Sequence, residues 1–201
     1  HSKGGNLALY SAVQSSTALR EQIAELLLLD SPGLMKSLLE KPSYQEVKAK
    51  MTVIRPQDSV VGVMLYWDMP AQLVASEGIG IAQHNALSWE VDLAINDFVH
   101  EDHPTELSQR LEETFQEWIE TLPNQQLKQV CDLVFDTILD SGIESLDDIG
   151  IQALPQIGQM LQEFGNLSDK QKKVLQDGFN QLLWIFWKSG NKKSSLLKLE
   201  L

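Results

Sequence analysis

PTELSQRLEETFQEWIETLP, residues 104–123, is the clearest helical pattern in the chain and decides the predicted fold. Its apolar side chains recur every three or four positions, as expected for one side of an α-helix. They are Leu107, Leu111, Phe115, Trp118, Ile119 and Leu122. Pro104 suits the first turn of a helix, and Pro123 ends it. The stretch predicts an amphipathic helix whose apolar side must be covered by other elements.

Similar spacing predicts further helices on both sides of this one. Ser16 is a candidate N-cap for the helix predicted at 17–30, and capping boxes start at Ser43 and Ser168. Pro155 is expected to kink the helix that contains it. The predicted ranges are 17–30, 31–41, 43–54, 87–98, 127–139, 149–164 and 168–190.

Two segments fit a strand as well as a helix. The apolar run at 58–67 is consistent with a buried helix or a short β element. Residues 88–96 alternate apolar and polar side chains, but the helical match there is longer. We therefore predict an all-α fold, an irregular bundle of about seven to nine helices, with one short β element around 58–67 as the alternative.

The length of 201 residues favours a single helical domain over residues 1–201. The alternative is an N-terminal lobe at 1–80 and a C-terminal lobe at 85–190, followed by a basic tail at 191–201. A single cysteine, Cys131, excludes an intramolecular disulfide. No apolar run reaches the roughly 18 residues of a transmembrane helix. We expect a cytoplasmic protein without a transmembrane segment.

Negative charge is concentrated between residues 89 and 148. This segment holds sixteen carboxylates but only Arg110 and Lys128 as basic residues, whereas the whole chain has a net charge of −12. Two predicted helices each place acidic side chains on one face, and these are Glu106, Glu113, Glu117 and Glu120, then Asp132, Asp136 and Asp140. We interpret the two rows as a docking surface for a protein with a basic surface; a solvated face is the alternative. Direct binding of nucleic acid is disfavoured by this charge.

LLWIFW, residues 182–187, is apolar around the whole helix circumference. A central helix surrounded by its own domain would explain this pattern. Alternatively, Trp184 and Trp187 contribute to a partner or homodimer interface, because tryptophan is favoured at binding hot spots.

HEDH, residues 100–103, is the one ligand-like cluster in the sequence and makes His100 and His103 weak candidates for metal binding. A polar turn before a helix is the simpler interpretation. We find no G-x-S-x-G nucleophile elbow, no phosphate-binding loop and no H-E-x-x-H motif, and we assign no chemistry to His1. Cys131 is predicted to lie in the core, and no cofactor is indicated.

These observations favour a non-catalytic adaptor or regulatory protein that binds a protein partner through an acidic helical surface. One alternative is a metal-dependent enzyme centred on His100 and His103. Another is a peripheral membrane protein that uses the Trp-rich C-terminal helix and the basic tail.

Overall fold

The structure is a computed structural model that describes residues 1–123, 125–130, 165 and 167–197. It divides into two compact units, His1–Gln116 and Glu117–Leu201. Helix α5 (Glu106–Thr121) contributes residues to both.

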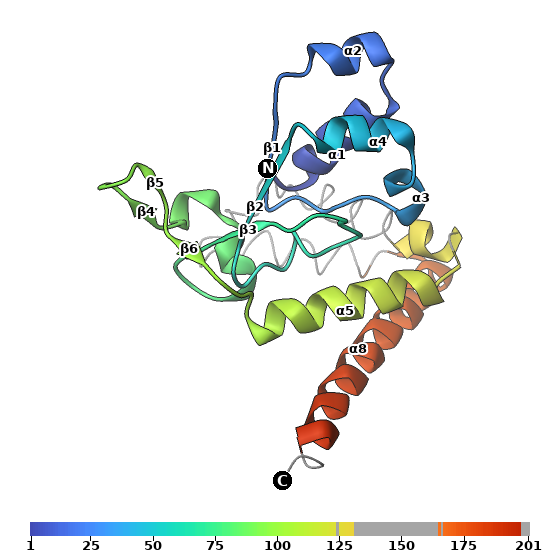
Figure 1. Ribbon diagram of the computed structural model, residues 1–201. Coiled ribbons are helices and arrows are strands. Elements are labelled where there is room, and N and C mark those ends of the chain that lie inside the picture. Colours follow the sequence, from blue (N-terminus) through green and yellow to red (C-terminus); the bar gives the residue numbers. More distant parts are fainter. Residues whose placement is uncertain (124, 131–164, 166, 198–201) are drawn as a thin grey trace. The chain divides into compact units, whose positions relative to one another are not determined.

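The first unit is built on a mixed four-stranded sheet, so the all-α prediction is wrong and the fold is mixed α/β (Figure 1). The strands follow the spatial order β1, β2, β3, β6. The first three are parallel, with Leu28 opposite Val53 and Ile54 opposite Gln72, and β6 runs antiparallel to β3. Their bounds are β1 (Leu26–Leu29), β2 (Met51–Pro56), β3 (Gln72–Val74) and β6 (His100–Glu101).

Helices pack beside this sheet. In Figure 1, α1 to α4 lie above the strands, and the part of α5 that belongs to this unit runs below them. Helix α1 contacts both β1 and α4. The bounds are α1 (Ser2–Gln14), α2 (Thr17–Gln22), α3 (Lys36–Leu39) and α4 (Pro42–Lys48), with the 3₁₀ turns η1 (Gly80–His84) and η2 (Ala86–Ser88).

Two apolar clusters explain why the sheet forms. In the first, Leu9 and Val13 of α1 pack with Leu28 of β1 and Val53 of β2. In the second, Ile54 and Val74 pack with Trp89, whose ring meets that of Phe98 edge-on at 5.6 Å between centroids. Since Val53 and Ile54 are neighbours on β2 and enter different clusters, both faces of the strand are covered.

Three predicted helices are replaced by strands. The helix predicted at 17–30 ends at Gln22 and is followed by β1, and the helix predicted at 43–54 ends at Lys48 and is followed by β2. The helix predicted at 87–98 is wrong, because β4 (Val91–Asp92) and β5 (Asp97–Phe98) form a two-stranded sheet there. Parallel strands covered on both faces carry continuous apolar runs, which resemble short buried helices.

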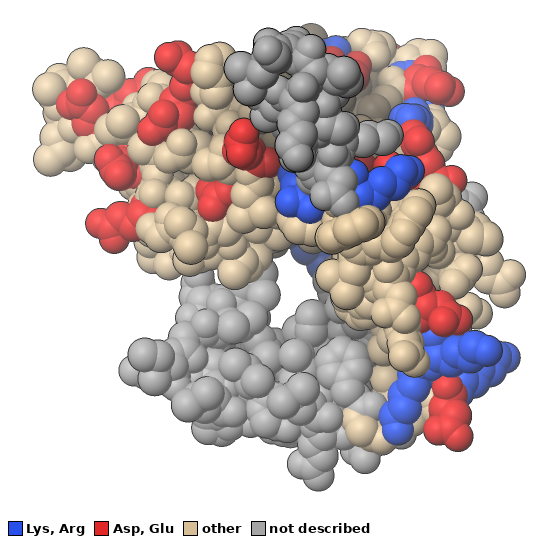
Figure 2. Space-filling view, turned by 90° about the horizontal axis from the view of Figure 1, so that it is seen from below, with Lys and Arg blue, Asp and Glu red and all other residues tan. Residues whose placement is uncertain are grey.

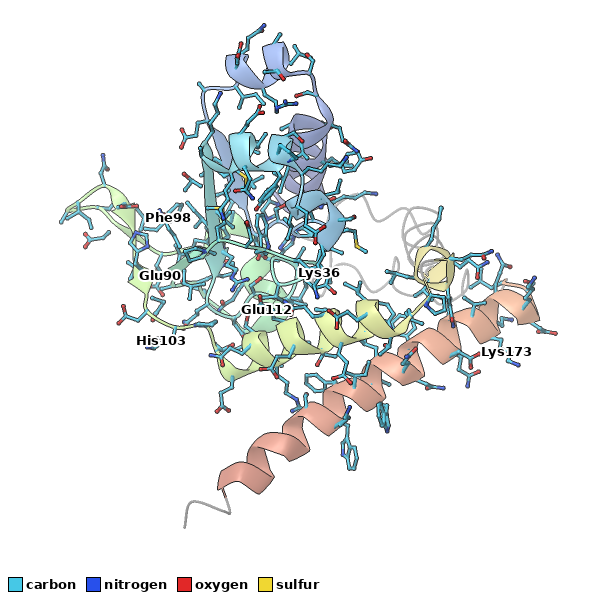
Figure 3. The ribbon with its side chains drawn as sticks, turned by 45° about the vertical axis from the view of Figure 1, so that its right-hand side comes forward. Lys36, Glu90, Phe98, His103, Glu112 and Lys173 are labelled. Atoms are coloured by element: carbon cyan, nitrogen blue, oxygen red, sulfur yellow. The ribbon has the colours of Figure 1, made fainter. Side chains whose placement is uncertain are left out.

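Residues 58–67 form turns, and Tyr66 makes an isolated bridge with Leu34. In contrast, the helix predicted at 104–123 is confirmed as α5. Its N-terminal half is tied to the first unit by an ion pair of 3.4 Å between Arg55 and Glu112, whose position is labelled in Figure 3. The Ser108 hydroxyl also donates to the Ser59 carbonyl oxygen at 2.9 Å.

The second unit contains the C-terminal helix α8 (Asp169–Leu197). The predicted capping box is confirmed: the Ser168 amide donates to Gln171 Oε1 at 3.0 Å, and the Gln171 amide donates to Ser168 Oγ at 3.4 Å. The predicted end at Gly190 is wrong, because α8 continues through it. Most of the segments predicted as helices at 127–139 and 149–164 lie outside the described residues. Within the described ranges, no helix has the length and apolar character needed to cross a bilayer.

A glycine in the first turns of α1 allows the helix to approach the segment after β1. A Cβ atom on Gly5 would lie 2.8 Å from both Cβ and Oγ of Ser31, whereas one on Gly4 would meet no described atom within 4 Å. We expect Gly5→Ala to lower the free energy of unfolding by about 1–3 kcal/mol, since overpacking forces the backbone to shift. Urea denaturation measures the change.

Gly4→Ala is the matched control for this substitution. Alanine favours helix over glycine by up to about 1 kcal/mol, so this variant should be as stable as the parent or slightly more so. Equal denaturation midpoints for the two variants would contradict the close approach of α1 to Ser31.

Candidate active site

Three polar segments meet where the parallel strands of the first unit end. Asp30 directly follows β1, Asp58 comes two residues after β2, and the segment after β3 leads to His84. Because β1, β2 and β3 are parallel, their carboxyl ends share one edge of the sheet. Ligands of open α/β sheets bind at this edge.

Asp30 is fully buried, and both of its carboxylate oxygens accept hydrogen bonds. Oδ1 accepts from the Ser59 hydroxyl at 2.5 Å and from the Gly62 amide at 3.0 Å. Oδ2 accepts from His84 Nδ1 at 2.6 Å. A buried carboxylate is tolerated only when its oxygens are satisfied in this way. These bonds hold the carboxylate in one orientation against the imidazole.

His84 is buried, with only 4% of its surface exposed. An ionised carboxylate can only accept, so Nδ1 carries the proton that it donates to Asp30. In the neutral imidazole, the free lone pair is then on Nε2. Nε2 is therefore the nitrogen that can take up a proton. Nε2 is buried and has no hydrogen-bond partner among the described residues. A buried nitrogen without a partner is rare, and a catalytic role is one of its recognised explanations.

A hydrogen-bond network fixes the segment that carries His84. Gln83 Nε2 donates to the carbonyl oxygens of Ser76 and Gly78 at 3.1 and 2.9 Å, and Gln83 Oε1 accepts from the Asp58 amide at 3.0 Å. The Asp58 carboxylate accepts from the Gly80 amide and from the Thr105 hydroxyl. These contacts fix the segment that directly precedes His84.

Ser2 is the first residue of α1 and has a φ of 55°, in the left-handed region. For a residue other than glycine, this conformation costs about 1–3 kcal/mol, and such residues cluster at active sites and ligand clamps. Asp30 shares this feature with a φ of 39°. The preceding residue, His1, lies against His84, with 4.4 Å between the two ring centroids. The start of α1 thus lies beside the imidazole.

Ser2, His84 and Asp30 can act together as a nucleophile, a base and the group that orients the base. Helix α1 begins at Ser2, so the positive end of its dipole lies at the serine. Negative charge that develops on an oxygen there is stabilised. The arrangement suits acyl transfer through a serine.

The histidines predicted as weak metal ligands lie elsewhere. His100 is exposed on β6 and its Nε2 lies 3.6 Å from Asp97 Oδ2. His103 is exposed in the segment before α5, as Figure 3 shows. In the part of the chain that the structure describes, no three His, Cys, Asp or Glu side chains are grouped to hold a metal ion.

The acidic row predicted at 106–120 lies on α5. Glu106, Glu113 and Glu120 are exposed, and Glu117 pairs with Lys188 at 3.0 Å. On the face shown in Figure 2, the acidic residues are interspersed with uncharged ones, and basic residues lie close to several of them. The second predicted row, Asp132, Asp136 and Asp140, and the predicted core position of Cys131 lie outside the described residues.

The tryptophans predicted to bind a partner are on α8. Trp184 and Trp187 are 57% and 66% exposed, whereas Ile185 between them is buried. The Lys188 ammonium lies 5.0 Å from the centre of the Trp184 ring. Within the second unit, this helix therefore has one buried side and one side with exposed aromatic rings.

Sequence reasoning missed Ser2, Asp30 and His84. The search for G-x-S-x-G needs a glycine two positions before the serine, and the sequence begins one position before it. The remaining signal is Ser2-Lys3-Gly4, which matches the second half of that pattern and opens a helix. A second signal is the chain order of serine, aspartate and histidine, which carries little information without the fold.

Comparison with known proteins places the chain in a family. The model of the Mbeg1-like family matches residues 1–136, which is more than half of the 201 residues. The chain belongs to the Mbeg1-like family. No curated protein and no solved structure gives a significant match. The matched residues include Ser2, Asp30 and His84.

Proposed function

We propose that this member of the Mbeg1-like family is a serine hydrolase that cleaves an ester or a related acyl bond. Ser2 is the nucleophile, His84 is the general base, and Asp30 orients His84. One observation carries the proposal: Asp30 holds Nδ1 of a buried histidine whose Nε2 has no partner among the described residues, and the ring of this histidine packs against that of His1, the residue before Ser2.

In the first half of the reaction, His84 Nε2 takes the hydroxyl proton of Ser2 as Oγ bonds to the carbonyl carbon of the substrate. The carbonyl electron pair moves to oxygen, where the N-terminal end of α1 stabilises the negative charge. When the carbonyl re-forms, the bond to the leaving group breaks and His84 gives its proton to that group. An acyl group then remains on Ser2.

In the second half, water attacks the acyl carbon and His84 Nε2 takes a proton from it. The bond between the acyl carbon and Ser2 Oγ breaks, and the proton passes from His84 to Oγ. The products are a carboxylic acid and free Ser2. Asp30 stays ionised throughout and stabilises the imidazolium that forms twice in each cycle.

The arrangement also resembles that of α/β-hydrolases in three respects. These enzymes place a serine at a strained turn that starts a helix, they order the triad along the chain as serine, acid and histidine, and they build the site at the carboxyl ends of parallel strands. This analogy at the level of fold supports the proposal.

A fluorophosphonate probe tests the proposed function directly, because it reacts only with an activated serine. We expect stoichiometric labelling, with the adduct mapped to Ser2 by mass spectrometry. His84→Ala should slow labelling by at least about 10³-fold, since the general base is lost. His103→Ala is the matched control and should label at the parental rate. Labelling at another residue, or equal rates in the two variants, would exclude this site.

Binding of a protein partner through the acidic residues stays a prediction, whereas the non-catalytic character predicted with it is replaced by the hydrolase proposal. The metal-dependent enzyme, the membrane-associated protein and the cytoplasmic location also stay predictions. The exposed rings of Trp184 and Trp187 support a partner or homodimer interface on α8. Such an interface would be compatible with hydrolase activity, since the residues of the proposed triad all lie in the first unit.

A further inference from the structure

We infer that His1 is a positioning residue that holds the proposed catalytic base in register with the nucleophile; this inference rests on the proposed hydrolase function. His1 Nε2 lies 2.8 Å from the main-chain carbonyl oxygen of His84. The two imidazole rings are also packed together, with 4.4 Å between centroids and an angle of 33° between their planes. His1 therefore contacts both the backbone and the side chain of His84.

The hydrogen bond determines that Nε2 of His1 is protonated. A carbonyl oxygen can only accept, so His1 Nε2 must carry the proton. The bond restrains the backbone of His84, and the ring contact restrains rotation of its side chain. Asp30 restrains the same ring at Nδ1. Together, His1 and Asp30 hold the ring of His84 in one orientation, so that Nε2 points in one direction.

The position of His1 in the sequence gives these contacts a further consequence. His1 is bonded directly to Ser2, so any contact that ties His1 to His84 also ties the nucleophile to the base. By contrast, Asp30 and His84 are 54 residues apart in the sequence, so their alignment depends on the fold between them. A shift of about 1 Å between reacting groups can cost about 10²-fold in rate. A direct link is therefore valuable for catalysis.

His1 is exposed. A role in positioning His84 can therefore be tested separately from a role in the stability of the fold. An exposed side chain contributes little to the free energy of folding, so its removal should leave the fold intact. The proton on His1 Nε2 is engaged by the carbonyl oxygen of His84 and takes no part in the proposed reaction. Its effect should appear in the rate of the chemical step and not in substrate binding.

Three substitutions separate the two contacts. His1→Ala removes both, His1→Phe keeps a ring against His84, and His1→Gln keeps a hydrogen-bond donor. We expect His1→Ala to lower kcat for p-nitrophenyl acetate, and the rate of fluorophosphonate labelling, by about 10- to 100-fold. KM should change by less than about threefold and the melting temperature should stay the same. Phe and Gln should each restore part of kcat.

The outcomes distinguish this inference from the proposed function. If the parent protein labels at Ser2 and His1→Ala has the parental kcat and labelling rate, His1 does not position the base and the hydrolase proposal stands. If the loss of kcat in His1→Ala is matched by a fall in melting temperature, and neither Phe nor Gln restores kcat, the role is structural and the inference is wrong. If the parent does not label at Ser2, both fail.

Discussion

Ser2→Ala is expected to lower kcat for p-nitrophenyl acetate by about 10⁴-fold or more, which is the largest effect that we expect from any substitution. The variant has no hydroxyl to attack the carbonyl, so only the residual catalysis from binding and from the N-terminal end of α1 would remain. Steady-state kinetics measure the change. Labelling by the fluorophosphonate probe should be lost as well.

Ser11→Ala is the control, because Ser11 is an exposed serine on the same helix. It should keep the parental kcat and labelling stoichiometry. The Ser2→Ala protein should also unfold at the parental urea midpoint, since alanine tolerates a φ of 55° about as poorly as serine does. Activity that survives Ser2→Ala with less than a tenfold loss would mean that another residue is the nucleophile.

Helix α5 could be predicted from sequence because only one of its sides is covered. Ile119 is buried and Glu120 beside it is exposed, so the helical period is visible in the residues themselves. The capping box at Ser168 could be predicted for a similar reason, since its hydrogen bonds join residues three positions apart. Structure that depends on residues close together in the chain can be recognised from a short stretch of sequence.

The central strands could not be predicted in this way. Strand β1 is a run of four leucines with no polar residue to mark a period. On β2, Val53 and Ile54 are both buried although they point to opposite faces. Such runs fit a buried helix equally well. Their identity as strands depends on partners that are distant in the chain, such as Val53 for Leu28 and Gln72 for Ile54.

The candidate site was missed because its parts are distant in sequence. Asp30 follows β1 and His84 is the last residue of η1, and neither belongs to a motif with fixed spacing. They come together because β1, β2 and β3 are parallel and end at one edge of the sheet. A sequence reading that assigns these strands to helices has no reason to connect them. The error in fold class and the missed site therefore have the same cause.

Asp30→Asn is expected to lower kcat by about 10⁴-fold while substrate binding changes little, because the amide disturbs the tautomer of His84. Asp30 Oδ1 already accepts from Ser59 and Gly62 and so keeps an oxygen in that position. The amide nitrogen then faces His84 Nδ1 and donates to it. The proton of the imidazole moves to Nε2, which can no longer accept the proton of Ser2. Kinetics and probe labelling should fall together.

Asp58→Asn is the matched variant, since Asp58 is the other buried aspartate at this edge of the sheet. Its carboxylate accepts hydrogen bonds from the Gly80 amide and the Thr105 hydroxyl, and in the described part of the chain it makes no hydrogen bond with the imidazole. Loss of one of these bonds should lower the free energy of unfolding by about 1–3 kcal/mol and leave kcat within about tenfold of the parent. If Asp58→Asn lowered kcat more than Asp30→Asn did, Asp58 would be the acid of the triad. The pairing of Asp30 with His84 would then not be the one used in catalysis.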